Sequence, residues 1–224
     1  MAISDDNAIE GEFKKGVHER LLDAAEELFA EKGFGATSVR QLACAAGCNI
    51  ASVNYYFGGK DKLYIEVWRR ELQVMRAARI ASIERVMSET DGDADLEGLL
   101  RSYAHAFVEP LADESRCRRL IRLMAREIID PHLPADMFLN EMVGPVMAAM
   151  EPALMKTCPG LPASKIPLQV ISLVGQLMHI GRVKALFDQA ASPGWPRFDL
   201  NEAVEHIVKF SAAGIRSYME PAAQ

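Results

Sequence analysis

The residues with the clearest capacity for chemistry lie between positions 37 and 63, TSVRQLACAAGCNIASVNYYFGGKDKL. Within this stretch Val53 and Phe57 are four positions apart, as expected on the buried side of a short helix. The polar residues around them are left on its outer side: Ser52, Asn54, Tyr55 and Tyr56. Tyrosine and serine hydroxyls reach phosphate oxygens, and an Asn amide pairs well with adenine. The segment therefore has the chemistry to bind duplex DNA.

Two short helices joined by a tight turn would present these side chains. Thr37 is expected to cap the first helix, and Gly47 to end it. Asn49 can cap the second helix, which runs from about Ile50 to Phe57. A helix from about residue 17 to 33 precedes the pair, and a long helix over about 61–88 follows it. This is the pattern of a helix-turn-helix held by a three-helix bundle.

Charge is distributed so that this segment can approach DNA, although the whole chain carries a formal net charge of −6. Residues 32–60 contain no carboxylate and three basic residues: Lys32, Arg40 and Lys60. The preceding helix instead carries acids at every fourth position: Glu19, Asp23, Glu27 and Glu31. Because a duplex repels such a stripe, we expect it to face away from DNA.

Composition narrows the class of protein further. The 224 residues are 50% hydrophobic and include only four cysteines, which excludes a mainly disordered chain and a small disulfide scaffold. The N-terminal residues do not resemble a signal peptide, and no apolar run is long enough to cross a bilayer, so a cytoplasmic protein without membrane contact is expected. No nucleophile-elbow, zinc-protease or phosphate-loop motif occurs, so we expect no enzyme, no cofactor and no metal site.

The remaining chain reads as helices separated by turn-forming stretches, over about 95–109, 115–129, 135–156, 165–190 and 199–219. The predicted fold class is all-α with about nine helices. We expect a flexible tail over 1–13, a helix-turn-helix domain over 14–60, and a helical C-terminal domain over 61–224.

The first of these domains resembles the DNA-binding domain of the TetR family of bacterial transcriptional regulators. The resemblance rests on about 50 residues with fixed spacings: Ala25, Leu28, Phe29, Gly33, Phe34, Thr37, Ser38, Ala43, Ala46, Gly47, Val53, Tyr56, Phe57, Lys60 and Leu63. Asn54 stands where the family usually has Tyr, a difference that bears on the operator sequence and not on the fold. The resemblance implies a bacterial, nucleoid-associated homodimeric repressor that binds a palindromic operator and is released by a small effector.

The resemblance also assigns DNA contacts by position. Phosphate contacts fall on Thr37, Ser38, Tyr56 and Lys60, and groove-facing positions on Ile50, Ala51, Ser52, Asn54 and Tyr55. Arg40 and Asn49 complete the set of candidate DNA-binding residues. An activator, or a repressor without a ligand, would use the same residues. A helical scaffold that has kept a non-functional head is a further alternative.

The C-terminal domain offers weaker signals. Arg126, Glu127 and Pro131 match an R-E-x-x-x-P signature of one TetR subgroup. Apolar, aromatic and basic residues on several helices are candidates for an effector pocket: Tyr103, Phe107, Arg122, Met124, Arg126, Phe138, Met142, Met178 and His179. The helix over 115–129 also carries Arg116, Arg118 and Arg119, with an apolar side at Leu120, Ile121, Met124 and Ile128. Its arginines either bind an anionic effector or form a face that meets the acidic stripe and couples the domains.

The last two long helices are expected to make a homodimer interface. Their apolar stripes are Ile171, Val174, Met178 and Leu186 on the first helix, and Ala203, Ile207, Phe210 and Ile215 on the second. In the TetR family this pair of helices forms a four-helix interface. The two helix-turn-helix domains of such a dimer, called reading heads below, could then enter successive major grooves about 34–36 Å apart.

Overall fold

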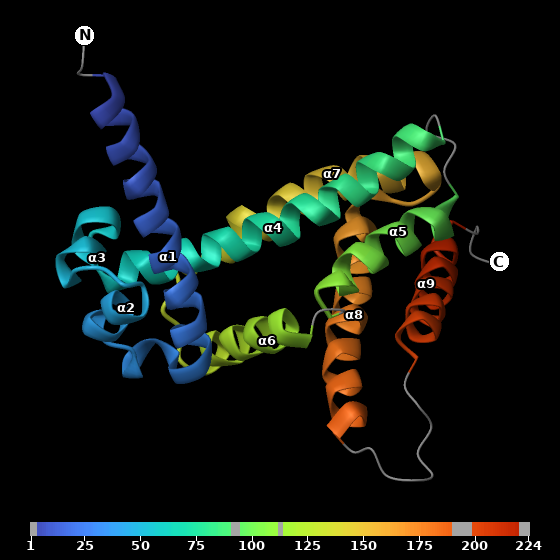
Figure 1. Ribbon diagram of the computed structural model, residues 1–224. Helices are drawn as coiled ribbons and strands as arrows, with labels where there is room; N and C mark the ends of the chain where they lie inside the picture. The colour runs from blue at the N-terminus through green and yellow to red at the C-terminus, as the bar shows by residue number, and fades with distance from the viewer. Residues whose placement is uncertain (1–3, 91–94, 112–113, 190–198, 220–224) are drawn as a thin grey trace. The chain divides into compact units, whose positions relative to one another are not determined.

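The computed structural model describes residues 4–90, 95–111, 114–189 and 199–219 of the chain. In these residues it contains nine α-helices and no strand, which confirms the predicted all-α class (Figure 1). The helices are α1 (Ser4–Ala36), α2 (Val39–Ala45), α3 (Ile50–Phe57), α4 (Lys60–Glu89), α5 (Leu96–Val108), α6 (Glu114–Ile129), α7 (Gly144–Thr157), α8 (Ile166–Gln189) and α9 (Leu200–Arg216).

The chain divides into two compact units. Unit 1 comprises Met1–Leu72 and Glu114–Met137, and unit 2 comprises Gln73–Asp113 and Phe138–Gln224. Unit 1 is therefore larger than the head expected over 14–60, because it includes the first turns of α4 and all of α6. Leu72 on α4 and Leu123 on α6 are almost fully buried, so both helices contribute to a hydrophobic core.

The core of unit 1 follows from the helical spacing of its apolar residues. Leu21 and Phe29 on α1, Leu42 on α2, Val53 on α3 and Leu63 on α4 are all 0% exposed. Each of these helices therefore buries one side, and the opposite side of α3 remains available to solvent. Helix α3 is too short to be stable alone, and its buried side chains fix it to the bundle.

Three expectations about the elements need correction. The flexible tail expected over 1–13 is helical from Ser4 onward. This stretch has no proline that would interrupt a helix. The helix expected over 135–156 begins instead with a π-helical turn, Leu139–Val143, before α7. Ile128, expected on the apolar side of α6, is 80% exposed.

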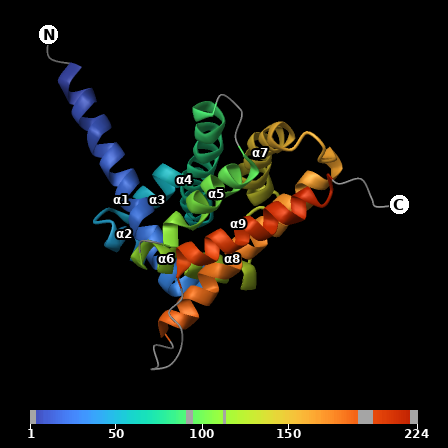
Figure 2. The ribbon, with the colours of Figure 1, turned by 90° about the vertical axis from the view of Figure 1, so that its right-hand side faces the viewer.

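Unit 2 is a helical bundle in which α8 and α9 lie side by side, as Figures 1 and 2 both show. Its core includes Leu99 and Leu100 on α5, Met150 on α7, Leu173 on α8 and Val208 on α9, each at most 2% exposed. Paired charges join α5 to α9: Arg101 to Glu205, and Arg216 to Glu97. Unit 2 is thus held by its own core and by pairs at its surface.

Candidate nucleic-acid interface

Helix α3 presents a mixed polar and apolar face to solvent. Val53 and Phe57 are 0% and 7% exposed, which confirms the predicted inner side. On the outer side Ile50 is 49% and Tyr55 is 70% exposed, and Asn54 is exposed with them. A helix that turns these side chains outward can offer an amide to base edges and apolar groups to thymine methyls.

The other residues expected on this face are placed less uniformly. Ala51 is exposed, whereas Ser52 and Tyr56 are half-buried. Asn49 caps α3 as predicted, since its side-chain oxygen accepts a hydrogen bond from the backbone N–H of Ala51 at 2.9 Å. The structure therefore gives Asn49 a structural task in addition to its predicted contact with DNA.

The start of α2 differs from the expectation. Ser38, and not Thr37, is the N-cap: its hydroxyl accepts from the N–H of Gln41, and the Gln41 side chain accepts from the N–H of Ser38. Thr37 is 1% exposed, and its hydroxyl donates to the carbonyl of Gly33 at 2.7 Å. The break in α1 at Gly33 provides that carbonyl, so the Thr37 side chain faces inward. Arg40 is exposed on α2.

Lys60 holds the junction between α1 and α2. Its ammonium group donates to the carbonyls of Phe34 and Thr37 at 2.9 and 3.0 Å, and lies 4.0 Å from the centre of the Phe34 ring. The sequence predicted a phosphate contact for this residue. In the structure its charge first stabilises the turn that leads into the helix-turn-helix.

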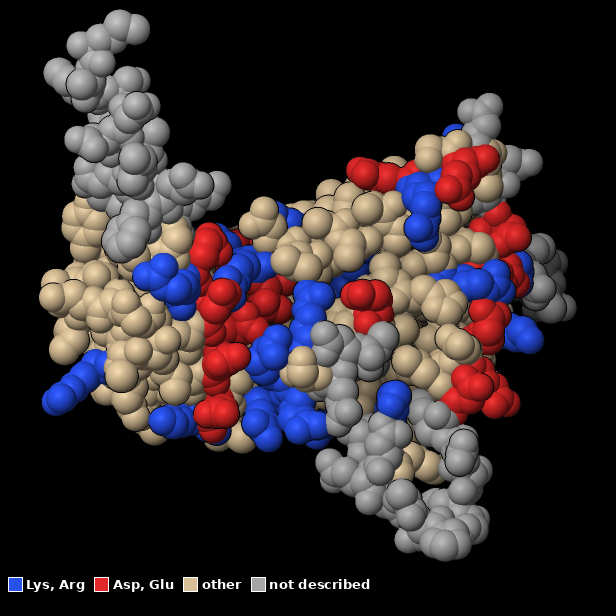
Figure 3. Space-filling view, in the orientation of Figure 1, with Lys and Arg blue, Asp and Glu red and all other residues tan. Residues whose placement is uncertain are grey.

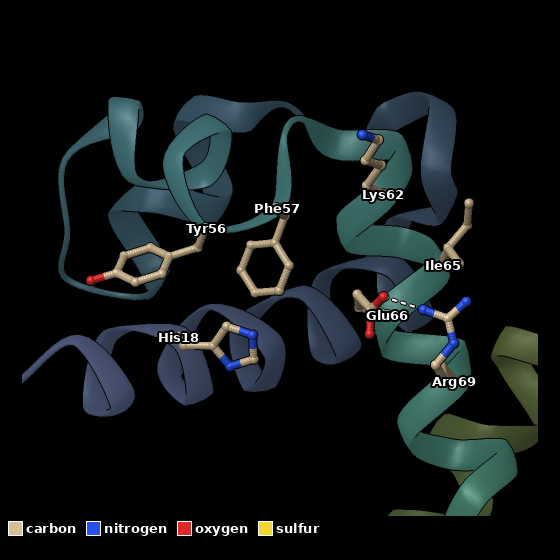
Figure 4. Close-up of a pocket in the computed structure, with 7 residues that line it drawn as sticks. All are labelled: His18, Tyr56, Phe57, Lys62, Ile65, Glu66 and Arg69. Atoms are coloured by element: carbon tan, nitrogen blue, oxygen red, sulfur yellow. Dashed lines mark hydrogen bonds and ion pairs between the residues drawn. The ribbon is translucent and has the colours of Figure 1, made fainter. Parts of the chain in front are cut away.

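A hollow of about 350 Å³ lies beside α3, between α1 and the start of α4. Figure 4 shows the residues that line it. The His18 ring stacks on Phe57 with 4.7 Å between centroids, and it meets Tyr56 edge-on at 6.3 Å. These contacts fix the end of α3 against α1. Lys62 also lines the hollow and is exposed, so it adds a positive charge beside α3 that the sequence reading missed. The position of Lys62, two residues after Lys60, could have indicated from the sequence that it lies near α3.

The acids of α1 are gathered away from the exposed face of α3. Arg70 on α4 pairs with Asp23 and Glu26 at 2.7 Å each, and Arg119 on α6 pairs with Glu26 at 3.0 Å. Figure 3 shows the red carboxylates over α1 next to the blue arginines of α6, while the surface over α2 and α3 is tan with scattered blue. Arg119 of α6 thus meets an acid of α1, but this acid, Glu26, is not a member of the stripe that was expected to face the arginines.

Comparison with known proteins agrees with this geometry. The family model described as bacterial regulatory proteins, tetR family, matches residues 21–67. A second, described as tetracyclin repressor-like, C-terminal domain, matches residues 101–214, about half of the chain. The chain belongs to the TetR family. It is a helix-turn-helix transcriptional regulator of that family.

Similar proteins are regulators of transcription. CecR of Shigella flexneri, a dual regulator, is 25% identical over 199 residues, which cover 85% of both chains. YttP of Bacillus subtilis is 42% identical over 50 residues, but this match covers only 22% of this chain and 24% of YttP. KstR2 of Rhodococcus jostii, a repressor, is 38% identical over 87 residues, or 39% of this chain and 41% of KstR2.

Solved structures show the same fold. A TetR-family regulator from Mesorhizobium loti superposes with a TM-score of 0.64 at 21% identity and covers 91% of this chain and 96% of its own. FadR of Bacillus subtilis, crystallised with stearoyl-CoA, gives 0.62 at 19% identity and covers 88% of this chain and 98% of its own. At these identities the likeness is one of fold.

In this TetR-family regulator, α6 is joined to the reading head by a polar junction. Arg126 donates to the carbonyl of Ala30 at 3.1 Å and also to that of Glu31, where α1 approaches its break. Glu127 accepts from the Tyr64 hydroxyl at 2.7 Å and from the N–H groups of His132 and Leu133 at 2.8 Å. Burial and the Glu127 carboxylate raise the pKa of Tyr64, so its hydroxyl stays a donor at neutral pH.

The candidate effector residues fall into separate groups. Arg122, Met124 and Arg126 belong to unit 1, and the polar atoms of Arg126 are engaged by α1. Phe138, Met178 and His179 are exposed in unit 2. The other three candidates, Tyr103, Phe107 and Met142, lie around Arg79. The sequence did not point to this cation, because only the arginines of α6 were considered.

Three further observations concern the cysteines, metal binding and the membrane. In the helix-turn-helix, Cys44 is exposed and Cys48 is half-buried. Within the described residues no group of His, Cys, Asp and Glu could hold a metal ion. None of the described helices combines the length and hydropathy needed to cross a bilayer.

Proposed function

We propose that the protein is a repressor that binds a palindromic DNA operator as a homodimer, in the cytoplasm at the nucleoid, and leaves it when a small molecule binds unit 2. The observation that carries DNA recognition is the exposed face of α3. Ile50, Asn54 and Tyr55 point outward from a helix whose other side is buried at Val53 and Phe57. Large side chains on such a rigid, exposed helix suit the floor of a major groove.

The proposed dimer interface is an exposed apolar face on α8 and α9. Its members are Leu168, Ile171, Met178 and Phe210, which are 57%, 62%, 49% and 63% exposed. Gly175 lies in the α8 stripe with no atom near the position of a Cβ, so a partner helix could approach closely there. Ile207 and Ile215, expected in the interface, are buried within the protomer, and the side chain of Leu186 lies outside the described residues.

Release would follow from a change in the spacing of the two heads. Helix α4 runs without interruption past Leu72, where unit 1 ends, and α6 is fixed to α1 by Arg126 and to α4 by Glu127. A shift transmitted by α4 or α6 would therefore carry the whole reading head. A coupling free energy of about 1–3 kcal/mol lowers operator affinity roughly 5- to 150-fold, which suffices for regulation.

A selection from random duplexes, followed by gel shift at several salt concentrations, tests DNA binding. We expect a palindromic site, and Asn54→Ala should relax the preference at one base pair per half-site by about 1–3 kcal/mol. Cys44→Ser, also at an exposed position of the helix-turn-helix, is the matched control. Weak binding without sequence preference would favour the scaffold alternative.

Sedimentation of an Ile171→Glu variant tests the dimer. A charge in the centre of an apolar interface should produce folded monomers with weak operator binding, since each monomer reads one half-site. Glu151→Lys, an exposed change on α7, is the control and should stay dimeric. A dimeric Ile171→Glu protein would place the interface elsewhere.

A further inference from the structure

Unit 2 holds a partly buried cation, Arg79, for which the described residues provide no anionic partner. Arg79 lies on α4, and its Nε atom is buried with no hydrogen-bond partner. One terminal nitrogen, Nη1, donates to the sulfur of Met142 at 3.4 Å. The guanidinium carbon lies 3.9 Å from the centre of the Phe107 ring. A thioether is a weak acceptor and a ring offers no lone pair to Nε, so the charge is poorly satisfied.

The electrostatic surroundings agree with this description. Burial lowers the pKa of Arg79, and among the described residues the neighbouring Tyr103 hydroxyl is the one ionisable group that acts in the opposite direction. Tyr103 is itself 1% exposed. An uncompensated charge in such a place destabilises a fold, unless a ligand supplies the missing anion.

The backbone beside Arg79 is also unusual. Met142 belongs to the π-helical turn Leu139–Val143, in which the N–H of Gly144 donates to the carbonyl of Leu139, five residues earlier. Arg76, one turn before Arg79 on α4, donates to the carbonyl of Glu141 at 2.9 Å and so holds this turn. Such π-helical turns are rare and occur frequently at functional sites, and this one places the Met142 sulfur on the guanidinium.

We propose that Arg79 anchors an anionic effector with an apolar body, whose carboxylate takes the place of the Met142 sulfur. This inference rests on the proposed function, because it names the chemical class of the effector. The planar fork of Arg79 matches a carboxylate with two parallel hydrogen bonds, one of them from the unpartnered Nε. Phe107, Tyr103 and the displaced Met142 side chain would contact the apolar part.

Replacement of the Met142 sulfur by a ligand carboxylate would also couple ligand binding to the conformation of the rest of unit 2. Met142 is 2% exposed and lies in the π-helical turn, so a ligand that displaces its side chain would press on the backbone of that turn. The turn leads directly into α7, which begins at Gly144. Ligand binding would therefore be coupled to the register of the backbone before α7.

Calorimetric titration of the full chain with two matched acid and alcohol pairs tests the proposal. The probes are decanoate with 1-decanol, and 2-naphthoate with 2-naphthalenemethanol, at pH 7. At least one acid should bind the wild-type protein ten times or more tightly than its alcohol. Arg79→Gln should abolish that preference, and Arg79→Lys should weaken it, because lysine keeps the charge but lacks the fork.

Two variants keep the test decisive. Arg85→Gln changes an exposed arginine of the same helix and should leave the preference intact. Met142→Ala removes the group that the carboxylate displaces and should tighten acid binding several-fold, so it tests the site even if Arg79→Gln does not fold. The proposal is overturned if neither acid is preferred tenfold by the wild type, or if folded Arg79→Gln keeps the preference.

Gel shift separates this inference from the proposed function. Unliganded Arg79→Gln should bind the operator like the wild type, because Arg79 lies outside the reading head. Loss of operator binding on addition of the preferred acid supports both proposals. Preferred acid binding by a protein that has no operator would leave the Arg79 site standing and refute the proposed regulator.

Discussion

Replacement of Glu127 by alanine should strongly destabilise unit 1. Its carboxylate accepts three hydrogen bonds, from the Tyr64 hydroxyl at 2.7 Å and from the N–H groups of His132 and Leu133 at 2.8 Å. Tyr64 is 2% exposed, so its hydroxyl would be left buried without a partner. The two N–H groups lie nearer solvent, and water can replace part of their loss.

The magnitude follows from these three bonds. A hydrogen bond to a charged group contributes about 1.5–3 kcal/mol, and a partly exposed N–H about 0.5–1.5 kcal/mol. Glu127→Ala should therefore lower the free energy of unfolding by about 3–5 kcal/mol. Tyr64→Phe, which removes the hydroxyl's hydrogen bond to the carboxylate, should cost about 1.5–3 kcal/mol. The double variant should show a coupling of about 1–2 kcal/mol between the two side chains.

Urea unfolding followed by tryptophan fluorescence measures these values. Trp68 is buried in unit 1, and a Trp195→Phe background leaves it as the only tryptophan. Glu66→Ala removes a surface carboxylate paired with Arg69 and should cost less than about 1 kcal/mol. A Glu127→Ala cost no larger than this control, or additive effects of Tyr64 and Glu127, would refute the reasoning.

Three further predictions concern unit 1. Burial raises the pKa of Glu71. The stability that this carboxyl contributes therefore falls as the pH rises above about 4.3, the ordinary pKa of a glutamate. Glu71→Gln should raise the unfolding temperature at pH 7, and this gain should shrink toward pH 4. The pKa of Tyr64 is also raised, so its hydroxyl stabilises the fold below about pH 10 and loses this effect above it; urea midpoints should fall more steeply above pH 10 for the wild type than for Tyr64→Phe. Gly33 has a φ of 82°, and a Cβ there would lie 2.8 Å from Nη1 of Arg126; Gly33→Ala should cost about 1–3 kcal/mol in a thermal or urea melt, and an unchanged midpoint would contradict this account.

The local spacing of residues was enough to predict most of the structure of the reading head. Val53 and Phe57 four residues apart predicted the buried side of α3, and Asn49 predicted its cap, because both depend on neighbours within one helical turn. The family motifs added the fold of the remaining chain. These inferences succeeded because helix formation, capping and amphipathic periodicity are short-range properties that a sequence displays directly.

Tertiary structure decided where the charged residues act. Lys60 binds the carbonyls of Phe34 and Thr37, Arg126 binds those of Ala30 and Glu31, and Arg79 donates to the sulfur of Met142. None of these partners is a sequence neighbour of its cation. Long side chains have many reachable partners, and the choice depends on which distant carbonyl, ring or sulfur the packed helices bring within hydrogen-bond distance.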